Sequence, residues 1–255
     1  MSANLGQEIR LAFAEAEQGH VFRFWDKISQ KEQNALLKQA NQIDLIELKE
    51  VLRQALNRGA SATQAFTDLE PTPWISLPVD LEGERCWREA DELGEELLRT
   101  GKVAAFTVAG GQGTRLGYDG PKGAYPVTPV SQKPLFQVFA EKLKATAKRY
   151  GGFIPWFIMT SEANHHQTKG FFDQRDYFGI PSSGVRFLQQ GMMPAVLETG
   201  EILLESPGRI AMNPDGHGGF FRALAKSGAT KEMHETGIEI ITYFQVDNPL
   251  APFLE

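Results

Sequence analysis

The chain has 255 residues, of which 42% are hydrophobic and 23% charged, and it contains one cysteine. This composition is typical of a globular protein and excludes a disordered, a collagen-like or a disulfide-stabilised chain. The formal net charge of −6 argues against a general nucleic-acid-binding surface. The sequence shows neither a secretory leader pattern nor a run of about 20 apolar residues, so we expect a cytoplasmic protein without a membrane partner.

Charge is distributed unevenly along the chain. Residues 1–100 carry 11 basic and 18 acidic side chains, whereas residues 101–150 carry 8 basic and 2 acidic ones. The basic segment also contains a group of glycines, between Gly101 and Gly123. Positive charge is therefore concentrated where the backbone is most accessible, which favours an anionic ligand.

The first part of the chain has helical periodicity. Apolar side chains recur at helical spacing in residues 5–16, 36–40 and 45–56. Ser29 and Glu32 have the spacing of a capping box, which marks the start of a helix. These patterns predict amphipathic packing helices, because their polar faces carry charges of both signs.

A linker is expected after these helices. Three prolines interrupt residues 71–78, and an acidic helical pattern follows over about residues 84–99. Cys86 lies in that pattern, and we expect it to be a buried small hydrophobic residue. The predicted organisation has three parts: a helical region (1–70), a linker and helix that pack on the core (71–100), and an α/β core (101–255).

From residue 101 onward, strand and helix patterns alternate. Apolar runs predict strands over residues 103–108, 156–159, 185–188, 202–204 and 238–246. Helical patterns separate them, over residues 135–150, 165–174, 220–226 and 230–236. This alternation predicts an α/β fold with a mostly parallel sheet.

The strongest chemical signal is a glycine-rich turn after the first predicted strand. It reads Val108-Ala109-Gly110-Gly111-Gln112-Gly113-Thr114-Arg115. Glycine lets backbone N–H groups approach a phosphate, and a turn at the carboxyl end of a parallel strand is where open α/β sheets bind ligands. The spacing matches neither the P-loop nor the dinucleotide fingerprint, and position 133, where a nicotinamide enzyme would need an acidic residue, is Lys133. On the residues alone, a phosphate loop and a tight structural turn stay equally open.

Four side chains in or after this turn have the chemistry to bind a nucleotide or a metal ion. Arg115 offers a planar fork for phosphate oxygens, and Lys122 adds a second cation after a rigid proline turn, so together they favour a nucleoside triphosphate. Asp247 ends the strongest predicted strand, where it is either a metal-binding carboxylate or part of a turn. The amide of Gln190 suits a pyrimidine edge but is equally compatible with a polar strand end.

A series of motifs resembles the eukaryotic-type UDP-sugar pyrophosphorylases, most closely the UDP-N-acetylglucosamine pyrophosphorylases. The resemblance covers nearly the whole chain. Its motifs are His20-Val21-Phe22-Arg23-Phe24-Trp25, Ala109 to Gly117 with Pro121-Lys122, Met159-Thr160-Ser161, Tyr177-Phe178-Gly179, Gln189 to Ala195, Pro214 to Gly219 and Val246-Asp247-Asn248.

This resemblance implies a Rossmann-like nucleotidyltransferase core of the glycosyltransferase-A type with a helical N-terminal extension. Family members transfer a uridylyl group reversibly from UTP to a sugar 1-phosphate, release pyrophosphate and use Mg²⁺. The partners implied are thus UTP, a sugar 1-phosphate, the UDP-sugar and pyrophosphate.

The resemblance also implies a role for each matching residue. Arg115 and Lys122 would be the catalytic residues that bind the triphosphate, and Asp247 would ligate the metal. His217 would lie beside the sugar. The nucleotide-binding residues would be Val108, Ala109, Gly110, Gly111 and Gly113, with Gln190 and Gly216 reading the uracil.

Two departures from the family pattern affect the expected function. The N-acetylglucosamine branch usually has asparagine where this chain has His217, whereas glucose-type and broad-specificity relatives have Gly-His-Gly, so the acceptor sugar stays open. The chain also stops at Glu255, soon after Asp247, without a second metal-binding carboxylate or a distal phosphate-binding lysine. We therefore expect the N-terminal half of a longer enzyme with an incomplete sheet. The alternative from another class is a catalytically silent nucleotide-binding module.

Overall fold

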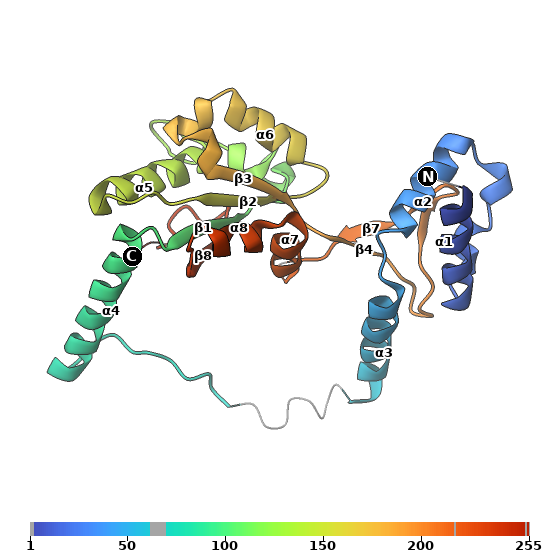
Figure 1. Cartoon of the computed structure of the whole chain (residues 1–255), viewed down its shortest axis with the longest axis horizontal. Coiled ribbons are helices and arrows are strands. Elements are labelled where there is room, and N and C mark those ends of the chain that lie inside the picture. Colours follow the sequence, from blue (N-terminus) through green and yellow to red (C-terminus); the bar gives the residue numbers. More distant parts are fainter. Residues whose placement is uncertain (1–2, 62–69, 217, 253, 255) are drawn as a thin grey trace. The chain divides into compact units, whose positions relative to one another are not determined.

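The computed structural model describes residues 3–61, 70–216, 218–252 and 254. Their contacts form two compact units (Figure 1). One unit comprises Met1–Ile75 and Met192–Pro214, and the other comprises Ser76–Gly191 and Asp215–Glu255. The first unit is mainly helical, and the second contains the α/β core.

The second unit is built on a four-stranded sheet in which all neighbouring strands are parallel. Its strands, in the spatial order β3-β2-β1-β8, are β3 (Val185–Gln189), β2 (Trp156–Thr160), β1 (Val103–Val108) and β8 (Ile240–Gln245). Val108 is in register with Met159 of β2 and with Gln245 of β8. This sheet confirms the predicted α/β fold, and β8 is two residues shorter at its start than the sequence predicted.

Helices cover both faces of this sheet (Figure 1). One face bears α5 (Leu135–Tyr150) and α6 (His165–Asp173), and the other bears α7 (Gly219–Ser227) and α8 (Ala229–Glu235). Strand side chains alternate between faces, so each face has its own core. The α5 side contains Ala105, Trp156, Ile158, Phe136 and Phe139, and the α7 side contains Ala104, Phe106, Phe157, Met159, Leu224 and Met233.

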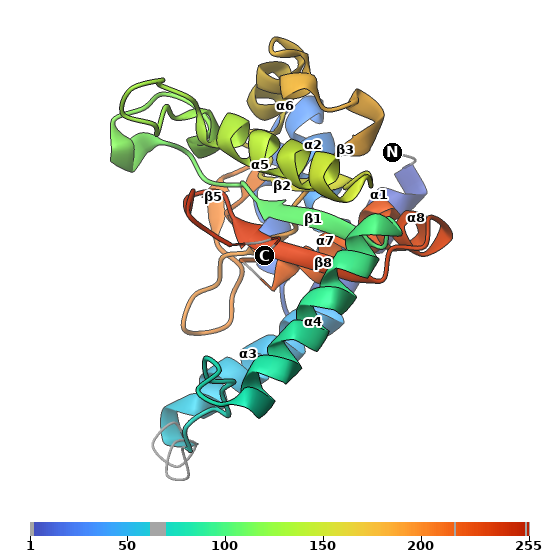
Figure 2. The ribbon, with the colours of Figure 1, turned by 90° about the vertical axis from the view of Figure 1, so that its left-hand side faces the viewer.

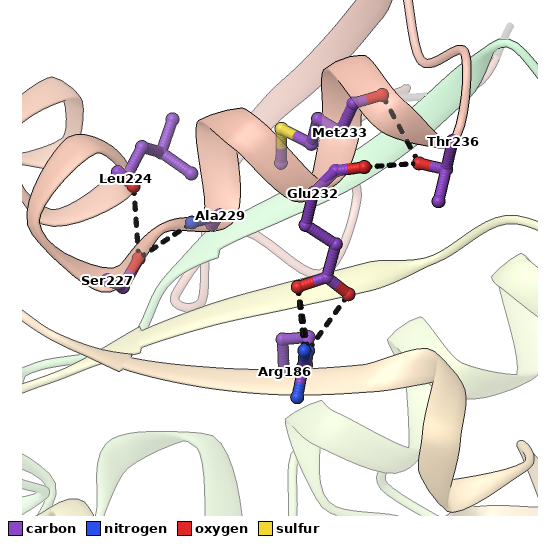
Figure 3. A network of polar contacts seen from close by, with 7 residues as sticks. All are labelled: Arg186, Leu224, Ser227, Ala229, Glu232, Met233 and Thr236. Carbon is purple, nitrogen blue, oxygen red and sulfur yellow. Dashed lines mark hydrogen bonds and ion pairs between the residues drawn. The ribbon is translucent and has the colours of Figure 1, made fainter.

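Polar contacts fix α7 and α8 (Figure 3). Arg186 of β3 binds both carboxylate oxygens of Glu232 of α8, with the closest contact at 2.7 Å. Ser227 Oγ donates to Leu224 O at 3.1 Å and accepts from Ala229 N at 3.3 Å. The first contact ties α8 to the outer strand β3, and the second joins the two helices at their shared turn.

Helix α4 (Leu81–Arg99) leads into β1 and extends away from the sheet (Figure 2). Asp80 caps its start, where Oδ1 accepts a hydrogen bond from Gly83 N at 2.8 Å. Of its described side chains, only Leu98 is buried. The expectation that Cys86 is buried is therefore wrong, because Cys86 is exposed.

Within its described residues, the first unit contains three α-helices and short strands. The helices are α1 (Ala3–Glu15), α2 (Gln30–Ala40) and α3 (Leu45–Ser61). Two antiparallel pairs join β4 (Met192–Pro194) to β7 (Met212–Pro214) and β5 (Leu204–Ser206) to β6 (Arg209–Ile210). Ser29 and Glu32 form the predicted capping box at the start of α2.

Residues 192–214 pack within this helical unit. Ile202 and Ile210 are buried in its core, and the side-chain amide of Gln18 bonds to Gly200 O at 3.0 Å and accepts from Ile202 N at 2.9 Å. The sequence places these residues in the α/β core, whereas their contacts place them with the helices. The predicted strand at 202–204 is correspondingly displaced toward β5.

Short 3₁₀ helices complete the described structure. In chain order they are η1 (Gly19–Phe22), η2 (Trp25–Lys27), η3 (Thr114–Leu116), η4 (Lys122–Ala124), η5 (Asp176–Gly179) and η6 (Ser182–Gly184). Among all the helices described, none has both the length and the apolar character needed to cross a membrane.

Candidate functional site

The predicted site residues lie at the edge where the four parallel strands end. The glycine-rich loop (residues 109–123) follows β1, Gln190 follows β3, and Asp247 follows β8. Val246 N donates to Val108 O at 3.1 Å, which places Asp247 beside the end of β1. Gln190 N donates to Thr160 O, the last residue of β2, at 2.8 Å. Ligands of open α/β sheets bind at this edge.

The glycine-rich loop folds back on itself. Gly113 N donates to Gly120 O at 2.8 Å, and Lys122 N donates to Gly111 O at 3.0 Å. A Cβ on Gly111 would lie 3.5 Å from Lys122 Cε. The lysine stem therefore passes directly beside the glycines that follow β1.

The start of this loop carries three consecutive backbone N–H groups that bond to nothing in the part of the chain that the structure describes. Ala109 N still bonds to Met159 O, at 2.7 Å. The amides of Gly110, Gly111 and Gln112 have no hydrogen-bond acceptor among the described residues. Gly111 is exposed and Gly110 and Gln112 are half-buried, so a ligand can reach these N–H groups, and consecutive backbone donors at a ligand-binding edge form a suitable site for an anion.

The loop and the segment after β8 also carry charged side chains. Lys122 Nζ lies 3.0 Å from Asp247 Oδ2, and their side chains are 26% and 48% exposed. Arg115, in η3, is exposed and has no ion-pair partner in the part of the chain that the structure describes. The structure thus brings Lys122 and Asp247 together, while the guanidinium of Arg115 is free to meet a ligand.

Gln190 lies against the loop. Its side-chain Oε1 would be only 2.7 Å from a Cβ on Gly110, so the amide occupies the space that the absent side chain leaves. Asp215 N donates to Gly191 O at 3.1 Å, which brings Gly216 close to the segment that carries Gln190. Gly216 itself has φ +75°, a conformation that favours glycine. His217, the predicted sugar-binding residue, lies outside the described residues.

Asp215 is a feature that the sequence patterns did not reveal. Both of its carboxylate oxygens are buried, and neither has a hydrogen-bond partner among the described residues. The carboxylate fits between Gly191 and Gly219, since a Cβ on either glycine would collide with it. The two glycines thus let the start of α7 and the Gln190 segment close around one side chain.

The turn between β2 and α6 is the second feature that sequence patterns missed. Thr160 Oγ1 donates to Leu188 O at 2.9 Å and lies 2.8 Å from His165 Nδ1. Because the hydroxyl proton points to Leu188, Nδ1 is the donor to Thr160. Burial lowers the pKa of His165 below its ordinary value, and the nearby His166 and Lys169 act in the same direction.

The chain offers few ligands for a metal ion. No group of three His, Cys, Asp or Glu side chains gathers as a metal site within the described ranges. Asp247 supplies one carboxylate beside the free amides. Mg²⁺ is commonly held by one or two carboxylates together with substrate phosphates and water, so this single carboxylate fits Mg²⁺ that arrives with a nucleotide.

The fold and this edge define an α/β protein with a glycine-rich loop at the ends of its parallel strands, and comparisons with known proteins identify its family. The family model of UTP–glucose-1-phosphate uridylyltransferase matches residues 80–254. The chain therefore belongs to this family, which confirms the resemblance to the UDP-sugar pyrophosphorylases.

Individual relatives agree with this assignment. A UDP-N-acetylhexosamine pyrophosphorylase-like protein 1 of Xenopus tropicalis is 38% identical over 98% of this chain and 51% of its own length. The UDP-N-acetylglucosamine pyrophosphorylase of Saccharomyces cerevisiae is 34% identical over 94% of this chain and 52% of its own length. The chain spans about half the length of these curated relatives.

A solved structure shares the fold over the whole chain. The uridine diphosphate N-acetylglucosamine pyrophosphorylase of Trypanosoma brucei, solved in complex with an inhibitor, superposes with a TM-score of 0.77. It is 26% identical and covers 100% of this chain and 53% of its own length. Both the helical unit and the α/β unit therefore belong to the shared fold.

Proposed function

We propose that this protein is a uridylyltransferase, which joins UTP and N-acetylglucosamine 1-phosphate to give UDP-N-acetylglucosamine and pyrophosphate. The observation that carries the proposal is the row of free amides of Gly110, Gly111 and Gln112, which lies between the ammonium group of Lys122 and the amide of Gln190. A phosphate chain fits the amides and the lysine, and a pyrimidine edge fits the glutamine. The family and the relatives named above support the same reaction.

In this reaction the protein positions two polyanions. The free amides, Lys122 and Arg115 bind the triphosphate oxygens, and the amide of Gln190 pairs with the uracil edge. An oxygen of the sugar phosphate then attacks the α-phosphorus of UTP, so that a new P–O bond forms as the bond to the leaving pyrophosphate breaks. Positioning and charge neutralisation carry such a transfer, and no nucleophilic side chain is required.

Asp247 is the residue that would hold Mg²⁺ in this proposal. When bound, the ion would help to neutralise the negative charge of the phosphates. Lys122, which pairs with Asp247 in the structure, would bind the phosphates. The proposal thus assigns a ligand to each member of the ion pair.

The acceptor sugar has a second candidate. His217 stands where glucose-type relatives have a Gly-His-Gly arrangement, and the matching family model carries a glucose 1-phosphate name. UDP-glucose is therefore the alternative product. A cytoplasmic location stays a prediction from the sequence.

Pyrophosphate release tests the proposal. The product of the complete reading frame is assayed with UTP, Mg²⁺ and N-acetylglucosamine, N-acetylgalactosamine or glucose 1-phosphate. We expect release that requires both substrates and is fastest with N-acetylglucosamine 1-phosphate. Faster release with glucose 1-phosphate would favour the alternative product. Saturable UTP binding with no release would instead favour a silent nucleotide-binding module.

A further inference from the structure

The side chain of Asn164, the residue that precedes α6, makes three hydrogen bonds in the interior of the second unit. Its side chain is fully buried. Its Nδ2 donates to Ala109 O at 2.9 Å and to Gly111 O at 3.2 Å, and its Oδ1 accepts from Ser161 N at 2.9 Å. The side chain thus connects the β2–α6 turn to two carbonyls of the glycine-rich loop.

These bonds determine where the loop amides point. In a planar trans peptide the C=O of one residue and the N–H of the next point in opposite directions. When Asn164 holds the carbonyls of Ala109 and Gly111, the N–H groups of Gly110 and Gln112 are turned away from it. These are two of the three free amides of the loop.

We infer that Asn164 is a positioning residue, which sets the affinity for the nucleotide by holding the loop peptides with their N–H groups toward the ligand. The inference rests on the proposed function for the identity of the ligand. It does not require Asn164 to touch that ligand, because the side chain is buried behind the loop. Glycine at three of the five positions from 109 to 113 leaves this loop flexible, so an external anchor has a large effect on its conformation.

Asn164→Asp tests this role most directly. It keeps the shape and the oxygen that accepts from Ser161, but it places a second oxygen against the carbonyls of Ala109 and Gly111. Ser161→Ala is the matched control in the same turn, because Ser161 Oγ is buried and has no partner among the described residues. The control therefore removes a buried polar group without touching the loop.

Two measurements on the chain separate positioning from folding. The first is residue-resolved amide hydrogen exchange without ligand, and the second is titration with UTP and Mg²⁺. For Asn164→Asp we expect exchange about tenfold faster at the Gly113 and Lys122 amides, unchanged exchange in β1 and β2, and UTP affinity about tenfold weaker. Ser161→Ala should match the unmodified chain in both measurements.

Asn164→Ala covers the case in which the aspartate variant does not fold. It removes both donors without adding charge, and it should shift both measurements in the same direction by a smaller factor. The inference is overturned if Asn164→Ala matches Ser161→Ala in loop exchange and in UTP affinity. If the unmodified chain binds no UTP, the proposed function fails, whereas the exchange measurement still decides whether Asn164 holds the loop.

Discussion

Lys122 Nζ lies 3.0 Å from Asp247 Oδ2, although the two residues are 125 positions apart in the chain. Parallel pairing of β1 with β8 brings them together, because it ends the two strands side by side. The pair is partly exposed, so it contributes little to stability. Its importance is instead functional. Lys122, which we propose to bind phosphate, is paired in this structure with Asp247, which we propose to bind the metal ion.

This contact predicts competition between lysine and metal. Lys122→Gln removes a positive charge from beside Asp247, so the free protein should bind a divalent cation more tightly, by about fivefold for a difference of about 1 kcal/mol. Mn²⁺ binding, followed by water proton relaxation without nucleotide, measures this. Asp247→Asn should abolish the gain in the Lys122→Gln background, and equal Mn²⁺ affinity of Lys122→Gln and the unmodified chain would contradict the competition.

The close approach of Gln190 to Gly110 predicts a specific effect on nucleotide choice. Gly110→Ala would place a Cβ 2.7 Å from Gln190 Oε1 and displace the amide. We expect the affinity for UTP to fall about tenfold, because the uracil would lose one hydrogen-bonding partner. The ratio of UTP affinity to CTP affinity should fall as well, because the Gln190 amide would no longer distinguish the two bases. Gly170→Ala in α6 is the control, because its Cβ would meet nothing within 4 Å. An unchanged UTP-to-CTP ratio in Gly110→Ala would count against a uracil-reading role for Gln190.

The buried carboxylate of Asp215 predicts a non-additive pair of substitutions. Gly219→Ala collides with Asp215, so it should destabilise the protein by about 1–3 kcal/mol. In an Asp215→Ala background the same substitution should cost less than about 0.5 kcal/mol, because the colliding atoms are gone. Urea unfolding of the four proteins measures this cycle. Additive costs would show that Gly219 is required for another reason.

His165 predicts a pH dependence of stability. Burial lowers its pKa in the folded protein below the ordinary value of 6.5, so the unfolded chain binds a proton more readily. The buried, neutral imidazole of His165 therefore contributes fully to the free energy of unfolding above about pH 6.5. This contribution is lost as the pH falls below that value, because the unfolded chain takes up the proton first. In urea unfolding, His165→Gln should therefore lose less stability than the unmodified chain between pH 7.5 and pH 5.5. Parallel losses in the two proteins would exclude His165 as the cause.

Local patterns predicted much of the fold. The strand Val103–Val108, the helix Leu135–Tyr150 and the capping box at Ser29 appear where the sequence placed them, because each depends on periodicity or on residues a few positions apart. The return of residues 192–214 to the helical unit could not be predicted in this way, because contacts such as Gln18 with Gly200 span 182 positions.

The same distinction between local patterns and long-range contacts applies to the candidate site. The glycine-rich loop, Lys122 and Asp247 were predicted because their residue types and motifs are visible in the sequence, whereas the ion pair between them was not. Asn164 and Asp215 were missed because ordinary polar residues in turns give no signal until their buried partners are known. Cys86 was misjudged because free cysteine is usually buried, and residue type alone does not show whether other elements cover the helix at that position.

Calorimetric titration of the chain with UTP in the presence of Mg²⁺ tests the central claim most directly. Lys122→Ala is compared with Lys133→Ala, which breaks a similarly exposed ion pair, to Glu141, at 2.7 Å. We predict saturable binding to the unmodified chain and to Lys133→Ala, and binding about ten- to a hundredfold weaker for Lys122→Ala, as expected for one charge-assisted contact. Absence of saturable binding, or equal affinity of all three proteins, would contradict the assignment of the glycine-rich loop as the triphosphate site.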